Sequence, residues 1–228
     1  MLLSSAGCTP LVDTEAQRRV MEHSCCSRVI PGNAAQSWSN PAGILRRPIV
    51  RALLASMCGA RILEVGAGNL RNSLFLLKRG FVVHVFDDPT ARIRFADRYR
   101  RFHARGGTLL NSIPGRPMYD LVLTTYVIET ICLPSARRNL AHAIAGSLSR
   151  GGRWLVAVRG PRNVVLARTK CLKCSDGYLT RQRTFVRGYT ITQLDRFLRK
   201  SASPLSRCSI ASGIRRQICS TWSLRGDK

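Results

Sequence analysis

The sequence predicts an α/β fold built around a doubly wound, mostly parallel sheet. Between residues 44 and 160, short apolar runs alternate with amphipathic helical patterns, and the connections between them are short. This alternation is typical of parallel strands that helices cover on both faces. A chain of 228 residues, 45% of them hydrophobic, is also long enough to bury one good core.

We expect three parts along the chain. Residues 1–43 lack a sustained period and contain several prolines, which indicates an irregular or partly helical N-terminal extension. Residues 44–160 hold the alternating pattern and form the core of the sheet. Residues 161–228 are a basic C-terminal part, which we expect to complete the sheet and to form one side of the functional site.

The predicted elements follow the periodicity of the apolar residues. Apolar runs of strand length cover residues 60–65, 81–86, 107–112, 119–127 and 153–160. Helical spacing covers residues 44–57, 70–80, 88–106 and 135–152. Pro48 counts against the first of these helices, whereas Gly80 and the pair Gly151 and Gly152 are suited to end two of them.

The first predicted strand runs into a glycine turn within the stretch RILEVGAGNLRNSLFLLKRG, residues 61–80. In a doubly wound sheet, ligands bind at the carboxyl ends of the strands, near the point where the strand order reverses. Gly66 and Gly68 allow the backbone to turn sharply and to approach a ligand closely. Glu64 and Asp87, at the ends of the first two strands, supply anionic acceptors. The pattern indicates a nucleotide-like cofactor, and it lacks the third glycine that a dinucleotide favours.

These residues resemble the first motif of the class I S-adenosylmethionine-dependent methyltransferases, in which an acidic residue precedes three alternate glycines. The chain matches this motif at Glu64, Gly66 and Gly68 and departs from it at Leu70. The resemblance implies a Rossmann-like, seven-stranded methyltransferase sheet with S-adenosylmethionine as the cofactor. The C-terminal part would then lie on the side of the methyl acceptor.

Two later segments agree with the resemblance. Residues 119–131 resemble the fourth strand of the superfamily, and residues 148–158 resemble its double-glycine turn and fifth strand. The glycine turn would lie against the amino acid portion of the cofactor. Asp87 would take the ribose hydroxyls, with Asp88 as the alternative. The cofactor-binding candidates implied in this way are Glu64, Gly66, Ala67, Gly68, Asn69, Asp87, Asp88, Asn111 and Tyr126.

The candidate catalytic residues are Glu129 and Tyr126, which follow the fourth strand. Glu129 is placed to act as a general base, although an acidic residue here is also suited to cap a helix or to face solvent. Tyr126 lines the site or packs in the core, and Asn111 contacts the adenine or serves a turn. The motifs that would name the acceptor atom are missing: residues 124–127 read Thr-Thr-Tyr-Val, and Cys132 is not preceded by proline.

The charge of the chain indicates an acidic partner. The sequence carries 37 Lys and Arg against 12 Asp and Glu, a net charge of +25. Basic residues with interleaved aromatics follow the fifth strand, which is typical of nucleic-acid contact, although a genome of high GC content also enriches arginine. The segment 176–198 resembles methyltransferases found alongside bacterial DNA-modification systems, which implies the same setting. The nucleic-acid-binding candidates are Arg159, Arg162, Arg168, Lys170, Lys173, Arg181, Arg183 and Arg187.

The nine cysteines are an odd number in a chain of this size, which fits a reduced, cytoplasmic setting. Cys171 and Cys174 form one C-x-x-C pair, and zinc needs four ligands, so we expect no metal. No apolar stretch reaches the length of a membrane span, and we expect no membrane contact. The sequence carries no signal for the oligomeric state.

We therefore expect a methyltransferase that acts on nucleic acid or on a molecule associated with it. The alternatives are a small-molecule methyltransferase and a non-catalytic module of the same fold that binds nucleic acid. Methyl transfer from a sulfonium depends largely on alignment of the nucleophile, so the lack of a conspicuous catalytic dyad does not exclude an enzyme.

Overall fold

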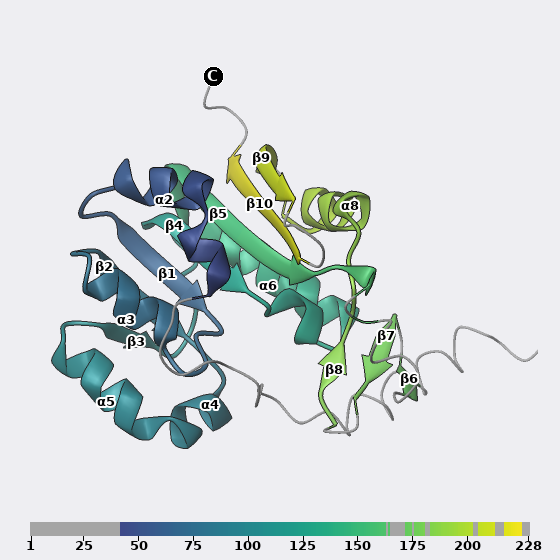
Figure 1. Ribbon diagram of the computed structural model, residues 1–228, viewed down its shortest axis with the longest axis horizontal. Coiled ribbons are helices and arrows are strands. Elements are labelled where there is room, and N and C mark those ends of the chain that lie inside the picture. The colour runs from purple at the N-terminus through teal and green to yellow at the C-terminus, as the bar shows by residue number, and fades with distance from the viewer. Residues whose placement is uncertain are drawn as a thin grey trace, which may run out of the picture.

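The computed structural model describes most of the chain after the first 41 residues. The described residues are 42–162, 164, 172–174, 176–180, 183–202, 205–212 and 217–224. The predicted N-terminal extension over residues 1–43 therefore lies almost wholly outside them. Figure 1 shows a central sheet with helices on both faces, which confirms the predicted Rossmann-like, doubly wound α/β fold.

The central sheet has seven strands in the order β3-β2-β1-β4-β5-β10-β9. The strands are β1 (Arg61–Val65), β2 (Val82–Phe86), β3 (Thr108–Leu110), β4 (Tyr119–Thr125), β5 (Leu148–Arg159), β9 (Leu205–Ser212) and β10 (Gln217–Leu224). The first five pair in parallel, and β10 is antiparallel to both β5 and β9. Because β1 pairs with β2 on one side and with β4 on the other, the strand order reverses at the end of β1.

The helices cover both faces of this sheet (Figure 1). The helical segments are η1 (Gly43–Arg46), α2 (Pro48–Ala55), α3 (Arg71–Leu77), α4 (Pro89–Arg94), α5 (Ala96–Ala104), η2 (Ile128–Thr130), α6 (Pro134–Ser147) and α8 (Ile191–Ser201). None of the helices within the described ranges is both long and apolar enough to cross a membrane.

Two predicted helices differ in detail from the observed ones. Pro48 stands at the first position of α2 and begins this helix, because its fixed φ and missing N–H suit a helix start. The helix predicted over residues 88–106 is divided into α4 and α5 at Phe95, whose φ of −117° and ψ of 31° are not helical. Both differences arise from the geometry of helix ends, which apolar spacing does not report.

The fifth strand begins earlier than predicted. The sequence places the end of a helix at Gly151 and Gly152, whereas α6 ends at Ser147 and β5 already contains both glycines. The register between β4 and β5 shifts between Tyr119 and Leu121, so the added residues form an irregular start to the strand. A Cβ atom on Gly152 would lie 2.7 Å from the carbonyl oxygen of Tyr119, which explains a glycine at that point.

The core has two halves, one on each face of the sheet. Ile62 of β1 packs with α2 and α3 on one face, whereas its neighbour Leu63 packs with α6 on the other. Successive side chains in a strand point to opposite faces, so strands buried on both faces read as continuous apolar runs. Trp154 and Trp222 are fully buried in the second half.

A second, three-stranded antiparallel sheet lies between β5 and α8 in the chain. Its strands are β6 (Leu172–Cys174), β7 (Gly177–Leu179) and β8 (Phe185–Val186). Figure 1 shows it at the lower right of the main sheet. The sequence did not predict these strands, because two or three residues are too few to show a period.

Candidate functional site

The turn after β1 is held in a conformation that favours glycine. Gly66, Gly68 and Leu70 have φ values of 71°, 55° and 61°, all in the left-handed region. The N–H of Gly66 donates a hydrogen bond to the carbonyl oxygen of Phe86 at 2.8 Å, which joins the turn to the end of β2. A Cβ atom on Gly66 would lie 2.5 Å from Cγ2 of Val127. Both its φ and this close approach therefore require glycine at position 66.

Leu70 stands where the motif has its third glycine, and its backbone has the left-handed conformation that favours glycine. Its φ of 61° and ψ of 17° are left-handed, which is costly for a residue with a Cβ. Its side chain is fully buried in the core against α2 and α3. Burial of the leucine side chain offsets the conformational cost, so the turn tolerates the departure.

Glu64 is fully buried and connects β1 to the start of α3. Its Oε1 accepts a hydrogen bond from Nδ2 of Asn72 at 2.8 Å, and its Oε2 accepts one from the Ser73 hydroxyl. Asn72 also donates to Oγ1 of Thr125 at 3.2 Å and accepts from the N–H of Ala42 at 2.7 Å. Burial raises the pKa of Glu64 to about 7, against the lowering effect of the Ser73 and Asn72 hydrogen bonds. Both oxygens thus hold the turn in place.

Asp87 lies beside the glycine turn, directly after β2. Its Oδ2 accepts hydrogen bonds from the N–H of Gly68 and from the hydroxyl of Tyr99, the latter at 2.8 Å. Its Oδ1 accepts one from the N–H of Asp88 at 2.8 Å. Burial raises the pKa of the Asp87 carboxyl, and these hydrogen bonds lower it.

Asp88 serves a different purpose from its neighbour. Its Oδ1 accepts a hydrogen bond from the N–H of Thr90 at 2.8 Å, which caps the N-terminus of α4. Of the two aspartates, Asp87 is therefore the one that lies against the glycine turn.

The remaining cofactor candidates lie around the same edge of the sheet. Ala67 and Asn69 are buried within the turn, and Oδ1 of Asn69 accepts a hydrogen bond from the N–H of Arg71 at 3.3 Å. Asn111 is exposed after β3, and its Oδ1 accepts a hydrogen bond from Arg92 at 3.2 Å. Arg92 also donates to the carbonyl oxygen of Asp87 at 3.1 Å. Arg92 thus links the ends of β2 and β3.

Tyr126 follows β4, which lies on the other side of β1 from β2 and Asp87. Its φ is 63°, an uncommon conformation for an aromatic residue, and its N–H donates to the carbonyl oxygen of Ala157 at 2.8 Å. The Arg159 guanidinium lies 5.5 Å from the centre of its ring. Burial and the nearby Glu129 charge raise the pKa of the Tyr126 hydroxyl to about 12, so this group is a hydrogen-bond donor at neutral pH.

Glu129 in η2 has a side chain that is 0% exposed. Neither of its carboxylate oxygens has a hydrogen-bond partner among the described residues. Nη1 of Arg159 lies 3.7 Å from its Oε1, which is an ion pair without a hydrogen bond. Burial raises the pKa of Glu129 to about 7, and the Arg159 charge and the nearby backbone N–H groups of Glu129 and Arg159 oppose this rise.

The segment after β8 covers this edge of the site. The N–H of Arg187 donates to the carbonyl oxygen of Glu129 at 2.9 Å, and the N–H of Tyr189 donates to that of Arg159 at 2.9 Å. These two bonds join the small sheet to η2 and to the end of β5. They also explain why Glu129, a short distance beyond the strand, is fully covered.

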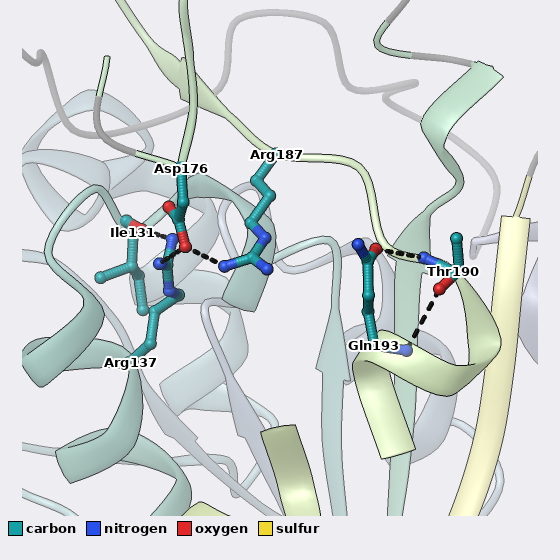
Figure 2. A network of polar contacts seen from close by, with 6 residues as sticks. All are labelled: Ile131, Arg137, Asp176, Arg187, Thr190 and Gln193. Carbon is teal, nitrogen blue, oxygen red and sulfur yellow. Dashed lines mark hydrogen bonds and ion pairs between the residues drawn. The ribbon is translucent and has the colours of Figure 1, made fainter. Parts of the chain in front are cut away.

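Figure 2 shows that Asp176 joins two arginines from different parts of the chain. Its Oδ2 pairs with Nη2 of Arg137 from α6 and with Nη1 of Arg187 beyond β8. The Arg137 side chain is 1% exposed and also donates to the carbonyl oxygen of Ile131 at 2.9 Å. The same view shows Thr190 and Gln193 in a reciprocal capping box at the start of α8. The ion pairs of Asp176 anchor the small sheet to α6.

The structure brings together some of the predicted nucleic-acid-binding residues. Arg159 and Arg187 lie beside Glu129 and contact acidic groups of the chain itself. Arg162 and Arg183 are exposed. Lys173 lies on β6, and the other three candidates lie outside the described residues, namely Arg168, Lys170 and Arg181.

The cysteine predictions are tested only in part. Cys171 lies outside the described residues, and of Cys174 only its place in β6 is described. Within the described ranges, no group of three or more His, Cys, Asp or Glu side chains is arranged to hold a metal ion. Cys58 and Cys219 are free thiols, whereas Cys132 is disulfide-bonded, so the expectation of reduced cysteines does not hold there.

Sequence reasoning missed several residues that organise the site, namely Asn72, Ser73, Arg92, Tyr99 and Arg137. Each of them binds a predicted site residue or anchors the segment that covers one. The sequence carried a faint signal for Asn72 and Ser73, since polar residues at the start of α3 interrupt an otherwise apolar helix face. Tyr99 read as an ordinary core aromatic of its helix.

Comparison with known proteins identifies the fold. No protein-family model matches the sequence, and no curated protein matches it. Solved structures do match. The PH0226 protein of Pyrococcus horikoshii superposes with a TM-score of 0.66 at 11% identity, over 84% of this chain and 97% of that one. A methyltransferase dependent on S-adenosylmethionine from Methanosarcina mazei has a TM-score of 0.63 at 17% identity, over 78% and 98%.

A third match is the 1,6-didemethyltoxoflavin-N1-methyltransferase of Burkholderia thailandensis, solved with bound 1,6-didemethyltoxoflavin and S-adenosylhomocysteine. Its TM-score is 0.57 at 16% identity, over 96% of this chain and 93% of that one. At these identities the matches establish the architecture of the chain, which is that of the methyltransferases dependent on S-adenosylmethionine.

Proposed function

Because the chain has the fold of the methyltransferases dependent on S-adenosylmethionine, we propose that it binds this cofactor and transfers its methyl group. One observation carries the proposal. The glycine turn after β1 is hydrogen-bonded to Asp87 after β2, at the point where the strand order reverses. This is the position at which sheets of this kind bind their ligands.

The residues at this point suit the cofactor. Gly66 has no room for a Cβ because Val127 packs against it, and this contact holds the turn close to the segment after β4. A carboxylate has about four lone-pair sites, and Asp87 accepts three hydrogen bonds within the chain. It therefore keeps capacity to accept a ribose hydroxyl. Glu64 and Asn72 would hold the turn in position without contacting the ligand.

When bound, S-adenosylmethionine supplies an electrophilic methyl group on a sulfonium. The protein then has to align a nucleophile with that methyl group and to accept a proton. Tyr126 and Glu129 follow β4 and stand across from the glycine turn, because Val127 between them packs against Gly66. We assign the acceptor side of the reaction to these two residues.

For the acceptor, we infer nucleic acid or a molecule associated with it. The net charge of +25 supports an anionic partner. The exposed Arg162 follows β5 closely, and Arg183 precedes the segment that covers Glu129. Arginine suits phosphate groups because its planar fork donates two parallel hydrogen bonds. A small molecule that carries a negative charge is the alternative acceptor.

A labelling experiment tests the proposal. Purified protein is incubated with S-adenosylmethionine tritiated in the methyl group, together with total RNA, genomic DNA or the small-molecule fraction of a cell extract. We expect label in RNA or DNA; label confined to the small-molecule fraction would favour the alternative acceptor. Nucleic-acid binding that weakens steeply with salt, without transfer of label to any fraction, would indicate a binding module in place of an enzyme.

Two glycine variants make the experiment specific to the site. Gly66→Ala places a Cβ against Val127 and should abolish transfer. Gly80→Ala is the matched control, because Gly80 has a similar φ of +81° and no atom within 4 Å of an added Cβ. Equal transfer by Gly66→Ala and Gly80→Ala would contradict the assignment of the glycine turn.

A further inference from the structure

The carboxylate of Glu129 is buried, and no hydrogen bond from the described residues explains its burial. The side chain is 0% exposed, and neither oxygen has a hydrogen-bond partner within the part of the chain that the structure describes. A buried carboxylate without hydrogen bonds costs several kcal/mol in its charged form, and such groups are rare in folded proteins. The nearest cation, Nη1 of Arg159, is 3.7 Å away and makes an ion pair only.

Glu129 and Tyr126 both lie beside Arg159. Tyr126 is held with a positive φ, a strained conformation for an aromatic residue, and burial and the Glu129 charge raise the pKa of its hydroxyl. Val127, which lies between Tyr126 and Glu129 in the chain, packs against Gly66, so this segment lies beside the glycine turn.

The cover over Glu129 also belongs to this arrangement. Backbone hydrogen bonds from Arg187 and Tyr189 close the segment after β8 over η2 and over the end of β5. An acceptor placed between this segment and the glycine turn would be shielded from water. In such surroundings a hydrogen bond to a carboxylate is stronger than it is in water.

We propose that the methyl acceptor is a nitrogen atom that bears at least one N–H, and that Glu129 accepts a hydrogen bond from it and takes its proton. The proposal rests on the proposed function and names the acceptor atom. The nitrogen lone pair forms the N–C bond while the S–C bond of the cofactor breaks and its electron pair stays on sulfur. The nitrogen becomes positively charged and passes its proton to the Glu129 carboxylate, which later releases it to solvent.

The chemistry of Glu129 favours nitrogen over other acceptors. A neutral N–H nitrogen needs to lose its proton only as the bond forms, and it then becomes acidic enough for a carboxylate with a pKa of about 7. A hydroxyl is a much weaker acid and would need a stronger base. An acceptor carboxylate would place a second negative charge against Glu129, which is unfavourable.

Two analogues of the cofactor test the place of Glu129 beside the transferred methyl group, and the labelled product of the tritium experiment tests the acceptor atom: label on nitrogen supports the proposal, and label in an ester or an ether overturns it. S-adenosylhomocysteine lacks the transferred methyl group, and sinefungin carries an amino group in its place. Calorimetry should show that sinefungin binds the wild-type protein at least about tenfold more tightly than S-adenosylhomocysteine. In Glu129→Gln this advantage should disappear, with the affinity for S-adenosylhomocysteine unchanged.

The outcomes separate the two proposals. If the wild-type protein binds neither analogue, the cofactor assignment fails, and this proposal fails with it. If S-adenosylhomocysteine binds and sinefungin has no advantage, or has the same advantage in both proteins, the cofactor site stands and the role of Glu129 is wrong.

A spectroscopic measurement on the wild-type protein covers the case in which Glu129→Gln does not fold. The chain contains only the glutamates Glu15, Glu22, Glu64 and Glu129. Carbon-13 labelling of their carboxyl groups therefore gives few NMR signals. The signals of Glu64 and Glu129 should both titrate near pH 7, and we expect one of the two to shift with sinefungin but not with S-adenosylhomocysteine. Signals that respond identically to the two analogues would overturn the proposal.

Discussion

The hydroxyl of Tyr99 donates a hydrogen bond of 2.8 Å to Oδ2 of Asp87, the carboxylate to which we assign the ribose of the cofactor. Tyr99→Phe removes this bond and should lower the free energy of unfolding by about 0.5–1.5 kcal/mol. It also frees a lone pair on Asp87, so calorimetry should show the affinity for S-adenosylhomocysteine within about threefold of wild type. A loss of affinity beyond tenfold would mean that Tyr99 itself contacts the ligand.

Substitution at Leu70 separates the cost of its backbone from the value of its side chain. Leu70→Ala should lower the free energy of unfolding by about 2–5 kcal/mol, because it removes a fully buried leucine and keeps the left-handed backbone. Leu70→Gly loses the same side chain and relieves the strain. Chemical denaturation should therefore find Leu70→Gly about 1 kcal/mol more stable than Leu70→Ala. The reverse order would show that Leu70 is not strained.

Asp176 holds the buried Arg137, so its charge should matter more than that of an exposed aspartate. Asp176→Asn leaves the guanidinium of Arg137, which is 1% exposed, without a counter-ion. Since Asp176 itself is 34% exposed, we expect a loss of about 1–3 kcal/mol in the free energy of unfolding. Asp97→Asn is the control, because Asp97 and Arg100 pair on the surface, where the loss should stay below about 0.5 kcal/mol.

Glu129 should make the stability of the protein depend on pH. Its pKa rises from 4.5 to about 7 on folding, so the folded chain binds a proton that the unfolded chain releases between these values. Stability therefore falls as the pH rises through this window, by up to about 3 kcal/mol from this group. Burial also raises the pKa of Glu64 to about 7, so Glu64 lowers the stability over the same pH range.

Glu129→Gln removes the contribution of Glu129 to this dependence. Denaturation at pH 5 and at pH 8 should show a smaller loss of stability for the variant than for wild type. Equal losses in the two proteins would show that Glu129 is ionised throughout, with partners beyond those described.

The parts of the fold that sequence reasoning predicted are those with a local signal. Buried parallel strands read as apolar runs, and the turn at Gly66 and Gly68 follows the first of them directly. Pro48 was misjudged, because the same residue disrupts a helix interior and begins a helix, and spacing alone does not tell which applies. The short strands β6, β7 and β8 carry no period at all.

The contacts that complete the site depend on long-range packing. Arg137 and Asp176 are 39 residues apart in the chain and meet only because the small sheet docks on α6. Arg159 was predicted to bind nucleic acid, and in the structure it faces Glu129. Glu129 was a candidate from its place after β4, but nothing in the sequence shows that its oxygens lack partners.

The central claim is that the edge of the sheet formed by the glycine turn and Asp87 binds S-adenosylmethionine. Calorimetric titration of the purified protein with S-adenosylmethionine, at low and at high salt, tests it most directly. We predict binding in the micromolar range that changes little with salt and is lost in Asp87→Ala, while circular dichroism shows that the variant stays folded. A folded wild-type protein that does not bind the cofactor, or a folded Asp87→Ala variant that binds it equally well, would contradict the claim.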